Sequence, residues 1–232
     1  VANQADDTVS VIDTATNTVT NTVAVGNVPI DVTVSLDSSK VYVANYGSNN
    51  VSVINTATNT VTNTVTVGSL PGTLSASPDG LKVYVTNSDG NTVSVINTAT
   101  NTVTTTVDVE TDPYGVAVSP DSSKVYVANF DSHTVSEIDT ATNTVTTTVR
   151  VGLQPSGVSV SPDGLKVYVA NYGSNNVSVI NTATNTVTTT VAVGVRPITI
   201  GHFIGPDLAP VPVPTAVPTL SQWAMIGLGL DR

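Results

Sequence analysis

The sequence of 232 residues contains no cysteine, and its aromatic and basic residues are scarce. Without cysteine the chain can form neither disulfides nor thiolate metal sites, and it has no cysteine nucleophile. Seven lysines and arginines stand against 17 acidic residues, which gives a net charge of −10. Because the few cations form no cluster, a surface that follows nucleic-acid phosphates is excluded, and no nucleic-acid partner is expected.

Long apolar runs are missing as well. The most apolar segment, Trp223 to Leu230, is much shorter than the roughly 18 residues of a membrane-spanning helix, so no spanning segment is expected. With two Phe, one Trp and seven Tyr in the chain, valine and isoleucine must supply most of the core, which favours strands. The chain starts at Val1 without a signal-peptide pattern, from which a processed start is expected.

What the sequence does have is a repeat of 42 residues. The stretch "KVYVANYGSNNVSVINTATNTVT" begins at Lys40 and returns unchanged at Lys166, three periods later. A fixed period of this length is typical of repeat architectures. Five copies are marked by one column of prolines, Pro29, Pro71, Pro113, Pro155 and Pro197.

Each unit predicts four short β-strands. In the unit that starts at Pro155 these are "GVSVS", "KVYVAN", "NVSVIN" and "TVTTTVAV", which are rich in Val, Tyr, Ile and Thr. Between them lie "SPDG", with glycine where a left-handed backbone is needed, and the Asx-type turn "NTATN". This pattern predicts an all-β fold, a β-propeller of four-stranded blades. A β-solenoid with two coils per unit is the main alternative, and the two hairpin turns favour the propeller.

The two chain ends predict how the ring closes. The chain enters late in one blade, completes four more, and ends in a lone strand of the innermost type, "PITIGHFIG". Five blades are therefore expected, closed by pairing of the N- and C-terminal strands through Ile198, Ile200 and Phe203. The predicted domains are a propeller over residues 1–205, a Pro-rich extended linker over 206–219 and an apolar C-terminal segment over 220–232.

The tetrads "YVAN" and "YVTN", followed by "TVSVINTATNTVT", resemble the YVTN family of β-propeller repeats, known from bacterial and archaeal surface and secreted proteins. The resemblance covers about residues 1–200. Members of that family often have seven blades, and this sequence does not contain seven units. Near the end, "VPTLSQW" resembles the IPTL-type C-terminal sorting signal of Gram-negative bacteria. Together these resemblances imply an exported bacterial protein, secreted or at the cell surface.

The C-terminal tail is predicted to add as a strand to another chain. Pro210, Pro212, Pro214 and Pro218 all sit at even positions, so in an extended strand their missing N–H groups lie along one edge. The other edge is free to pair with a sheet. The nearly uncharged outer strands of the blades are the expected receptors, unless their Thr hydroxyls and short length keep them soluble. The predicted self-association residues are Val211, Val213, Val217, Leu220, Trp223, Met225, Ile226 and Leu228.

No constellation of catalytic or metal-binding residues is found. His133 and His202 are the only histidines and occupy different repeat positions, so they cannot form a multi-histidine metal centre. Most carboxylates belong to repeated turns, where bonds to the turn backbone explain them. A calcium site built from Asp6, Asp7 or Asp131 is conceivable, although no loop has the dense ligand spacing of a calcium motif. No catalytic residue, metal or cofactor is predicted.

These features predict a non-catalytic structural protein that self-assembles into an extracellular layer, matrix or filament. Nearly identical blades leave none chemically distinguished, as an enzyme requires. One alternative is an adhesion module that binds surface glycans or a protein, with Tyr46, Phe130 and Tyr172 as loop contacts. Another is a lactonase-like propeller enzyme.

Overall fold

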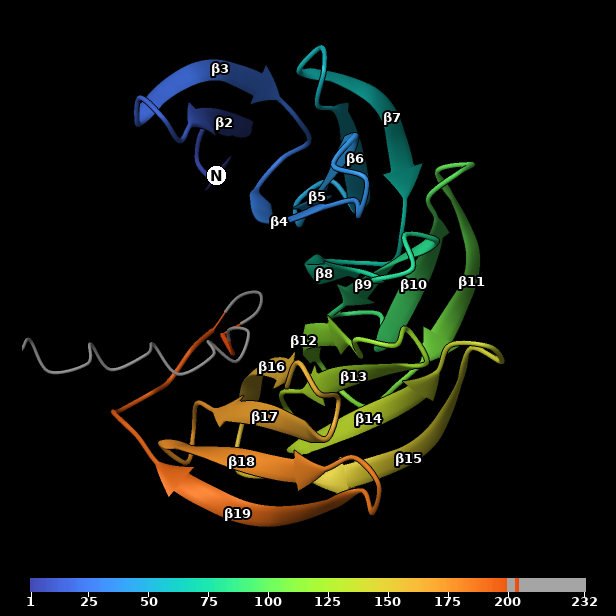
Figure 1. Cartoon of the computed structure of the whole chain (residues 1–232), viewed down its shortest axis with the longest axis vertical. Coiled ribbons are helices and arrows are strands. Elements are labelled where there is room, and N and C mark those ends of the chain that lie inside the picture. The colour runs from blue at the N-terminus through green and yellow to red at the C-terminus, as the bar shows by residue number, and fades with distance from the viewer. Residues whose placement is uncertain (200–202, 205–232) are drawn as a thin grey trace, which may run out of the picture.

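The computed structural model describes residues 1–199, 203 and 204, and in this part nineteen β-strands form five antiparallel sheets without any helix. The sheets are set around a common axis like the blades of a propeller (Figure 1). The predicted all-β, five-bladed propeller architecture is therefore confirmed. Four sheets have four strands and the first has three. Among the described residues, no helix offers a candidate membrane span.

Each strand holds the same place in its sheet as its counterpart one period away. The innermost strands are β4 (Pro29–Val34), β8 (Pro71–Ala76), β12 (Pro113–Val118) and β16 (Pro155–Val160). The second strands are β1 (Ala2–Asn3), β5 (Lys40–Asn45), β9 (Lys82–Asn87), β13 (Lys124–Asn129) and β17 (Lys166–Asn171). The third strands are β2 (Thr8–Asp13), β6 (Asn50–Asn55), β10 (Thr92–Asn97), β14 (Thr134–Asp139) and β18 (Asn176–Asn181). The outermost strands are β3 (Thr18–Ala24), β7 (Thr60–Thr66), β11 (Thr102–Asp108), β15 (Thr144–Arg150) and β19 (Thr186–Ala192).

The turns use the chemistry that the sequence predicts. Gly80 and Gly164 have φ of +76° and +73°, the left-handed backbone expected at the end of "SPDG". In "NTATN" the first asparagine is the acceptor: Asn55 Oδ1 accepts the N–H groups of Ala57 and Thr58 at 2.9 and 3.0 Å. The last asparagine of each such turn adopts positive φ, as at Asn59 with +52°. These local bonds fix the same hairpin in every blade.

The core lies between neighbouring sheets. Tyr42, Val51, Val53 and Val65 of the second sheet pack against Leu74 and other apolar side chains of the third. The same positions, moved on by one period, form the next two junctions. Because valine and isoleucine fill both sides, each junction is a dry apolar layer, and burial of this layer is the main stabilising term.

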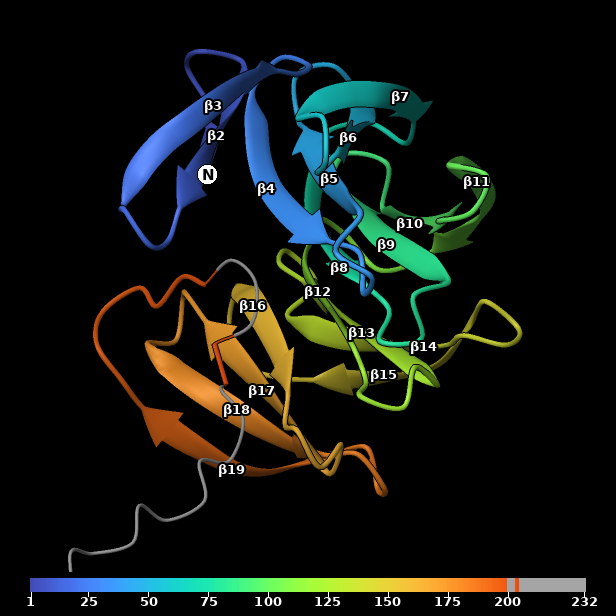
Figure 2. The same ribbon diagram turned by 45° about the horizontal axis from the view of Figure 1, so that its top comes forward.

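The series of sheets has two ends. Figures 1 and 2 show the first sheet and the fifth sheet at opposite ends of the arc. Packing between consecutive sheets runs from the first to the fifth, and among the described residues no comparable packing joins the fifth to the first. The proposed closing strand has Ile198 outside any strand and exposed, while Ile200 lies outside the described residues. Closure through this strand stays a prediction.

Candidate functional site

The blade sequences are nearly identical, so the few repeat positions at which they differ are easy to find. The second, third and outer strands scarcely change from blade to blade, whereas the second and third positions of the innermost strands do. Ile30, Gly72, Tyr114 and Ser156 share one repeat position, and the next position holds Asp31 in β4. The loop after the second strand varies too. The variable positions of the innermost strands lie beside the propeller axis, and the blades are distinguished there and in the adjoining loops.

An aromatic row forms at this variable end. The ring centroids of Tyr114 and Phe130 lie 6.4 Å apart, and those of Phe130 and Tyr172 lie 6.1 Å apart, both pairs tilted. The guanidinium carbon of Arg196 lies 5.6 Å from the centroid of the Tyr172 ring, within the range of a cation–π interaction. We call Tyr114, Phe130, Tyr172 and Arg196 the axial row. It joins residues from two blades, the fourth and the fifth, and the segment that follows β19.

Two of the three predicted loop contacts, Phe130 and Tyr172, thus meet in the axial row. The third, Tyr46, lines a separate cavity of about 300 Å³ together with the acidic side chains of Asp89, Asp112 and Asp131. Burial raises the pKa of Asp112, and the charge of Asp131 raises it further. No group of three His, Cys, Asp or Glu side chains among the described residues is placed to hold a metal ion.

Asp31 is the buried carboxylate of the axial end. Only 8% of it is exposed. Its Oδ1 accepts the N–H of Val32 at 2.8 Å, and its Oδ2 accepts the N–H of Leu74 in the next sheet at 3.0 Å. Burial raises the pKa of Asp31 to about 6, although both hydrogen bonds oppose the shift. Asp31 therefore ties two blades together through a carboxyl group whose pKa is raised by burial.

Sequence reasoning missed Asp31 and Tyr114. The sequence did contain a signal for both, since each differs in type from its counterparts in the other innermost strands. Tyr114 was hidden because it lies in a strand and not in a loop. Burial raises the pKa of Tyr114, and the nearby charges of Asp112 and Asp31 add to this effect. The two residues therefore belong to one electrostatic environment.

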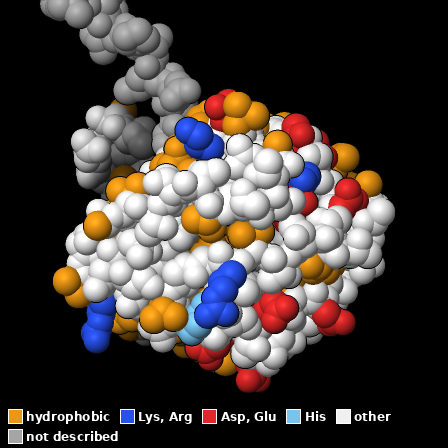
Figure 3. Space-filling model, turned by 90° about the horizontal axis from the view of Figure 1, so that it is seen from below, with side chains coloured by type: hydrophobic (Ala, Val, Ile, Leu, Met, Phe, Trp, Pro, Cys, Tyr) orange, Lys and Arg blue, Asp and Glu red, His pale blue; other side chains and the backbone are white. Residues whose placement is uncertain are grey.

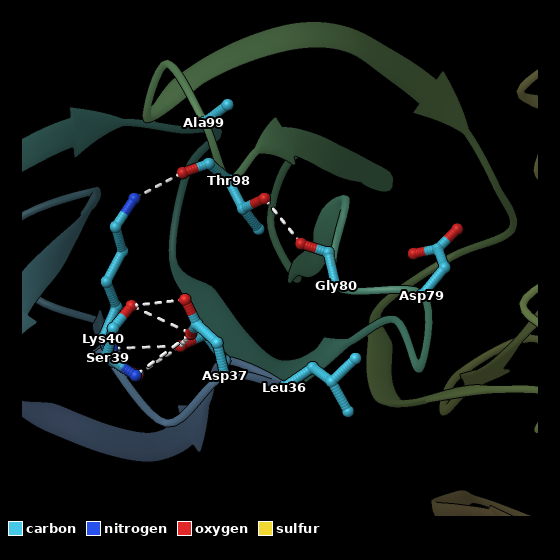
Figure 4. Close-up of a pocket in the computed structure, with 9 residues that line it drawn as sticks. Leu36, Asp37, Ser39, Lys40, Asp79, Gly80, Thr98 and Ala99 are labelled. Atoms are coloured by element: carbon cyan, nitrogen blue, oxygen red, sulfur yellow. Dashed lines mark hydrogen bonds between the residues drawn. The ribbon is translucent and has the colours of Figure 1, made fainter.

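A second repeated site lies between the blades at their other end. Figure 4 shows Lys40 reaching from the second sheet to the third, where its Nζ donates to the carbonyl oxygen of Thr98. Lys40 Nζ also lies 3.3 Å from Asn101 Oδ1. A cavity of about 410 Å³ beside it is lined by Asp37, Asp79 and their neighbours. Lys82 repeats the arrangement one junction further on.

The junction between the fourth and fifth sheets breaks this pattern. Lys124 Nζ is 2.8 Å from Glu137 Oε1, a carboxylate that stands where the other blades carry valine. Glu137 is buried, and its Oε2 has no hydrogen-bond partner. Asn185 Oδ1, which corresponds to the acceptor of the other junctions, is buried and without a partner as well. One substitution has therefore redirected the lysine and left two polar atoms unsatisfied.

The turn aspartates are structural, as the sequence predicts. Asp37 Oδ1 accepts the Ser35 hydroxyl at 2.6 Å and the Ser39 N–H at 3.0 Å. These bonds, the Ser35 bond first, lower the pKa of Asp37 to about 2. Asp121 and Asp163 make the equivalent bonds in their own turns.

His133 and Asp7 also have structural roles. His133 Nδ1 accepts the N–H of Gln154 at 3.1 Å, just as Asp7 Oδ1, at the same repeat position three units earlier, accepts the N–H of Val28 at 2.8 Å. The His133 ring stands where other blades carry asparagine and supports the next loop in the same way. His202 and all the predicted tail residues, from Val211 to Leu228, lie outside the described residues.

Comparison with known proteins agrees with this architecture. The chain matches the family described as YNCE-like beta-propeller over residues 1–86 and 71–172. Because these matches cover most of the chain, it belongs to the YNCE-like β-propeller family. No curated protein matches the sequence.

Two solved structures are similar to this chain. A hydrazine synthase structure from Kuenenia stuttgartiensis matches with a TM-score of 0.68 and 27% identity over 71% of this chain. A functionally unknown protein from Desulfotomaculum acetoxidans matches with a TM-score of 0.77 and 20% identity over 85% of it, which shows the fold alone. The chain spans about half the length of the first (49%) and 66% of the second.

Proposed function

We propose that this protein is a non-catalytic structural protein, secreted or at the bacterial cell surface, that self-assembles into an extracellular layer, matrix or filament. The observation that supports it best is the row of bare outer strands. Within the described part of the chain, β3, β7, β11, β15 and β19 each end a sheet, and each therefore presents one unpaired backbone edge.

The outer strands carry almost none of the features that normally protect an edge. Their side chains are mostly exposed threonine, with one charged residue in β11 and one in β15. In the view of Figure 3 uncharged polar side chains and backbone make up most of the surface, and charges are scattered. Sheets with such edges pair readily with another strand. The Pro-rich tail, with one edge free of proline, is the partner strand that the sequence provides.

The test is the particle mass of the full chain in solution. In an edge-charged variant, Thr64→Lys/Thr106→Lys/Thr148→Lys, each lysine replaces an exposed residue of an outer strand. A tail-charged variant, Val211→Lys/Val213→Lys/Val217→Lys, places charges on the tail that is proposed to pair with these edges. We expect the wild-type chain to form multi-chain particles by light scattering and both variants to form smaller ones. A wild-type chain that stays single at every concentration would contradict the proposal.

The axial row favours a second candidate function, an adhesion module. Flat aromatic faces such as those of Phe130 and Tyr172 stack on the apolar faces of sugars or on cationic side chains. Within the row, the Tyr172 ring already contacts one cation, Arg196. Binding of surface glycans on an array should then be lost in Phe130→Ala and Tyr172→Ala and kept in Leu36→Ala, which changes an exposed turn residue.

A further inference from the structure

The junction between the fourth and fifth sheets holds a lysine, a carboxylate and an amide. It lies inside the series of sheets, and all three residues are among those that the structure describes. Lys124 is in β13, Glu137 is in the neighbouring β14, and Asn185 is in the turn between β18 and β19. We call Lys124, Glu137 and Asn185 the junction triad.

An equivalent junction shows that the lysine can reach the asparagine. Between the second and third sheets, Lys40 crosses to the turn of the next sheet (Figure 4), and its Nζ lies 3.3 Å from Asn101 Oδ1. The next junction repeats this contact at 3.5 Å. Lys124 and Asn185 hold the same two repeat positions, and the strands pair in the same register. Rotation of the Lys124 side chain therefore brings its Nζ beside the Asn185 amide.

Glu137 supplies a base beside this lysine. Its Oε1 lies 2.8 Å from Lys124 Nζ and accepts the hydroxyl of Thr146 at 2.8 Å. Only 3% of Glu137 is exposed, and its Oε2 has no hydrogen-bond partner among the described residues. Every other blade has valine at this position. The carboxylate is thus peculiar to one junction, and burial beside an apolar layer favours transfer of a proton that neutralises the ion pair.

Asn185 contributes an amide whose oxygen can accept a further hydrogen bond. Its Oδ1 is buried and without a partner in the part of the chain that the structure describes. At the equivalent junction the Tyr42 hydroxyl lies 3.3 Å from Asn101 Oδ1, so the Tyr126 hydroxyl has the same reach toward Asn185. Burial, and then the charge of Glu137, raise the pKa of Tyr126, so this hydroxyl stays protonated. It can donate to an oxyanion that forms on Asn185 Oδ1.

We propose that Lys124 and Asn185 become joined by an intramolecular isopeptide bond, which ties the fourth blade covalently to the fifth. Glu137 takes a proton from the Lys124 ammonium, and the resulting amine attacks Cγ of the Asn185 amide. A cavity of about 280 Å³, which Lys124 and Tyr126 line, leaves room for the lysine to turn and for the leaving group to depart.

The reaction needs no oxidant and no further reactant. A bond forms between Lys124 Nζ and Asn185 Cγ, and the bond between Cγ and Nδ2 of Asn185 breaks. Of the three protons of the lysine ammonium, one stays on the new amide nitrogen and two leave with the Nδ2 group, which departs as ammonium. Glu137 carries protons between the two nitrogens and ends as the carboxylate with which it began.

The cross-link suits the composition of the chain. Because the sequence has no cysteine, a disulfide cannot tie one blade to another. A bond between distant residues restricts the unfolded chain in the same way as a disulfide does. The inference goes beyond the proposed function and does not rest on it, because the bond links two blades of one chain whatever the protein binds.

Mass spectrometry of the folded full chain tests the proposal. The wild-type mass should be lower than the mass of its sequence by one ammonia molecule, and a digest should contain a branched peptide that joins Lys124 to Asn185. Lys124→Arg, Asn185→Ala and Glu137→Gln should each have the full mass of their own sequence. Lys82→Arg is the matched control, since its junction lacks the carboxylate, and it should keep the wild-type loss.

The wild-type chain alone can overturn the inference, whether or not any variant folds. A wild-type chain of full mass would do so. A loss of ammonia that persists in Lys124→Arg would do so too, because an asparagine that closes onto its own backbone loses the same mass. A branched peptide formed to the wild-type extent in Glu137→Gln would overturn the role of Glu137 as the base. In an Asn185→Ala background the bond cannot form, so the effect of the ion pair on stability can be measured there.

Discussion

Val149 and Val191 are the same residue at the same position of consecutive blades, yet one is buried and the other half exposed. The internal junctions and the exposed faces of the first and fifth sheets share their amino acids, their strands and their turns. They differ only in whether another sheet is packed beside them. The comparison teaches that burial in a repeat protein is a property of the array, since each unit depends on its neighbours for its core.

The largest expected effect is a direct test of this difference. Ile96→Ala opens a cavity in a closed junction and should lower the free energy of unfolding by about 2–5 kcal/mol. Ile12→Ala, the same change on the first sheet, should cost less than about 1 kcal/mol in dilute single chains, because the Ile12 side chain already contacts water. Urea unfolding measures both. Equal losses would show that Ile12 is covered in solution.

The next effect concerns the pH dependence of the junction that Asp31 bridges. Its pKa rises from 3.8 in the unfolded chain to about 6 in the fold, so the folded protein favours the protonated form. The associated stability is fully present below pH 3.8 and is lost as pH rises through 6, which amounts to about 2–3 kcal/mol. Turn carboxylates with lowered pKa, such as Asp37, act in the opposite direction between about pH 2 and 4.

Thermal stability should therefore be greatest near pH 4 and should fall toward pH 7. Asp31→Asn should remove the decline between pH 4 and 6 and leave the acid side of the profile unchanged. Asp37→Asn should reduce the loss of stability on the acid side. Melting temperatures across this range check both, and a decline that persists in Asp31→Asn would assign it to other groups.

A smaller effect should follow from the close approach of two innermost strands. A Cβ on Gly115 of β12 would lie 2.9 Å from the Ser156 carbonyl oxygen and 3.0 Å from the Gly157 Cα of β16. Both are backbone atoms, so Gly115→Ala should force the two sheets apart and cost about 1–3 kcal/mol. Gly90→Ala is the matched control, because Gly90 is exposed in a loop and faces only side-chain atoms at 3.3 Å or more, apart from one backbone oxygen at 3.7 Å. Its stability should change little in the same unfolding experiment.

The smallest expected effect is a gain. Glu137→Val restores the residue found in the other blades and removes a buried carboxylate oxygen without a partner. It also frees Lys124 to bond across its junction as Lys40 and Lys82 do. Replacing a buried ion pair by an apolar side chain is often neutral or stabilising. We expect the free energy of unfolding to rise by about 1 kcal/mol. Lys124→Met should lower the free energy of unfolding, since it leaves the buried Glu137 carboxylate without its cation. A loss of stability in Glu137→Val would show that the ion pair is net stabilising.

Much of the fold could be predicted because its determinants are local. The left-handed Gly164, the acceptor role of Asn181 and the alternation in "KVYVAN" depend on neighbours within a few residues. The axial row could be predicted only in part. The sequence indicates Phe130 and Tyr172 as loop contacts, but their contact with each other joins residues 42 apart across two blades.

The period, the four strands of each unit and the chemistry of the turns were determined by the sequence alone, because hydrogen bonds and side-chain alternation within one unit specify them. The raised pKa of Asp31, the diversion of Lys124 to Glu137 and the exposure of Ile12 and Val191 were decided only by the tertiary structure. Each of these depends on what the neighbouring sheet places beside the residue. A repeat specifies its own shape, but its surroundings depend on its place in the series.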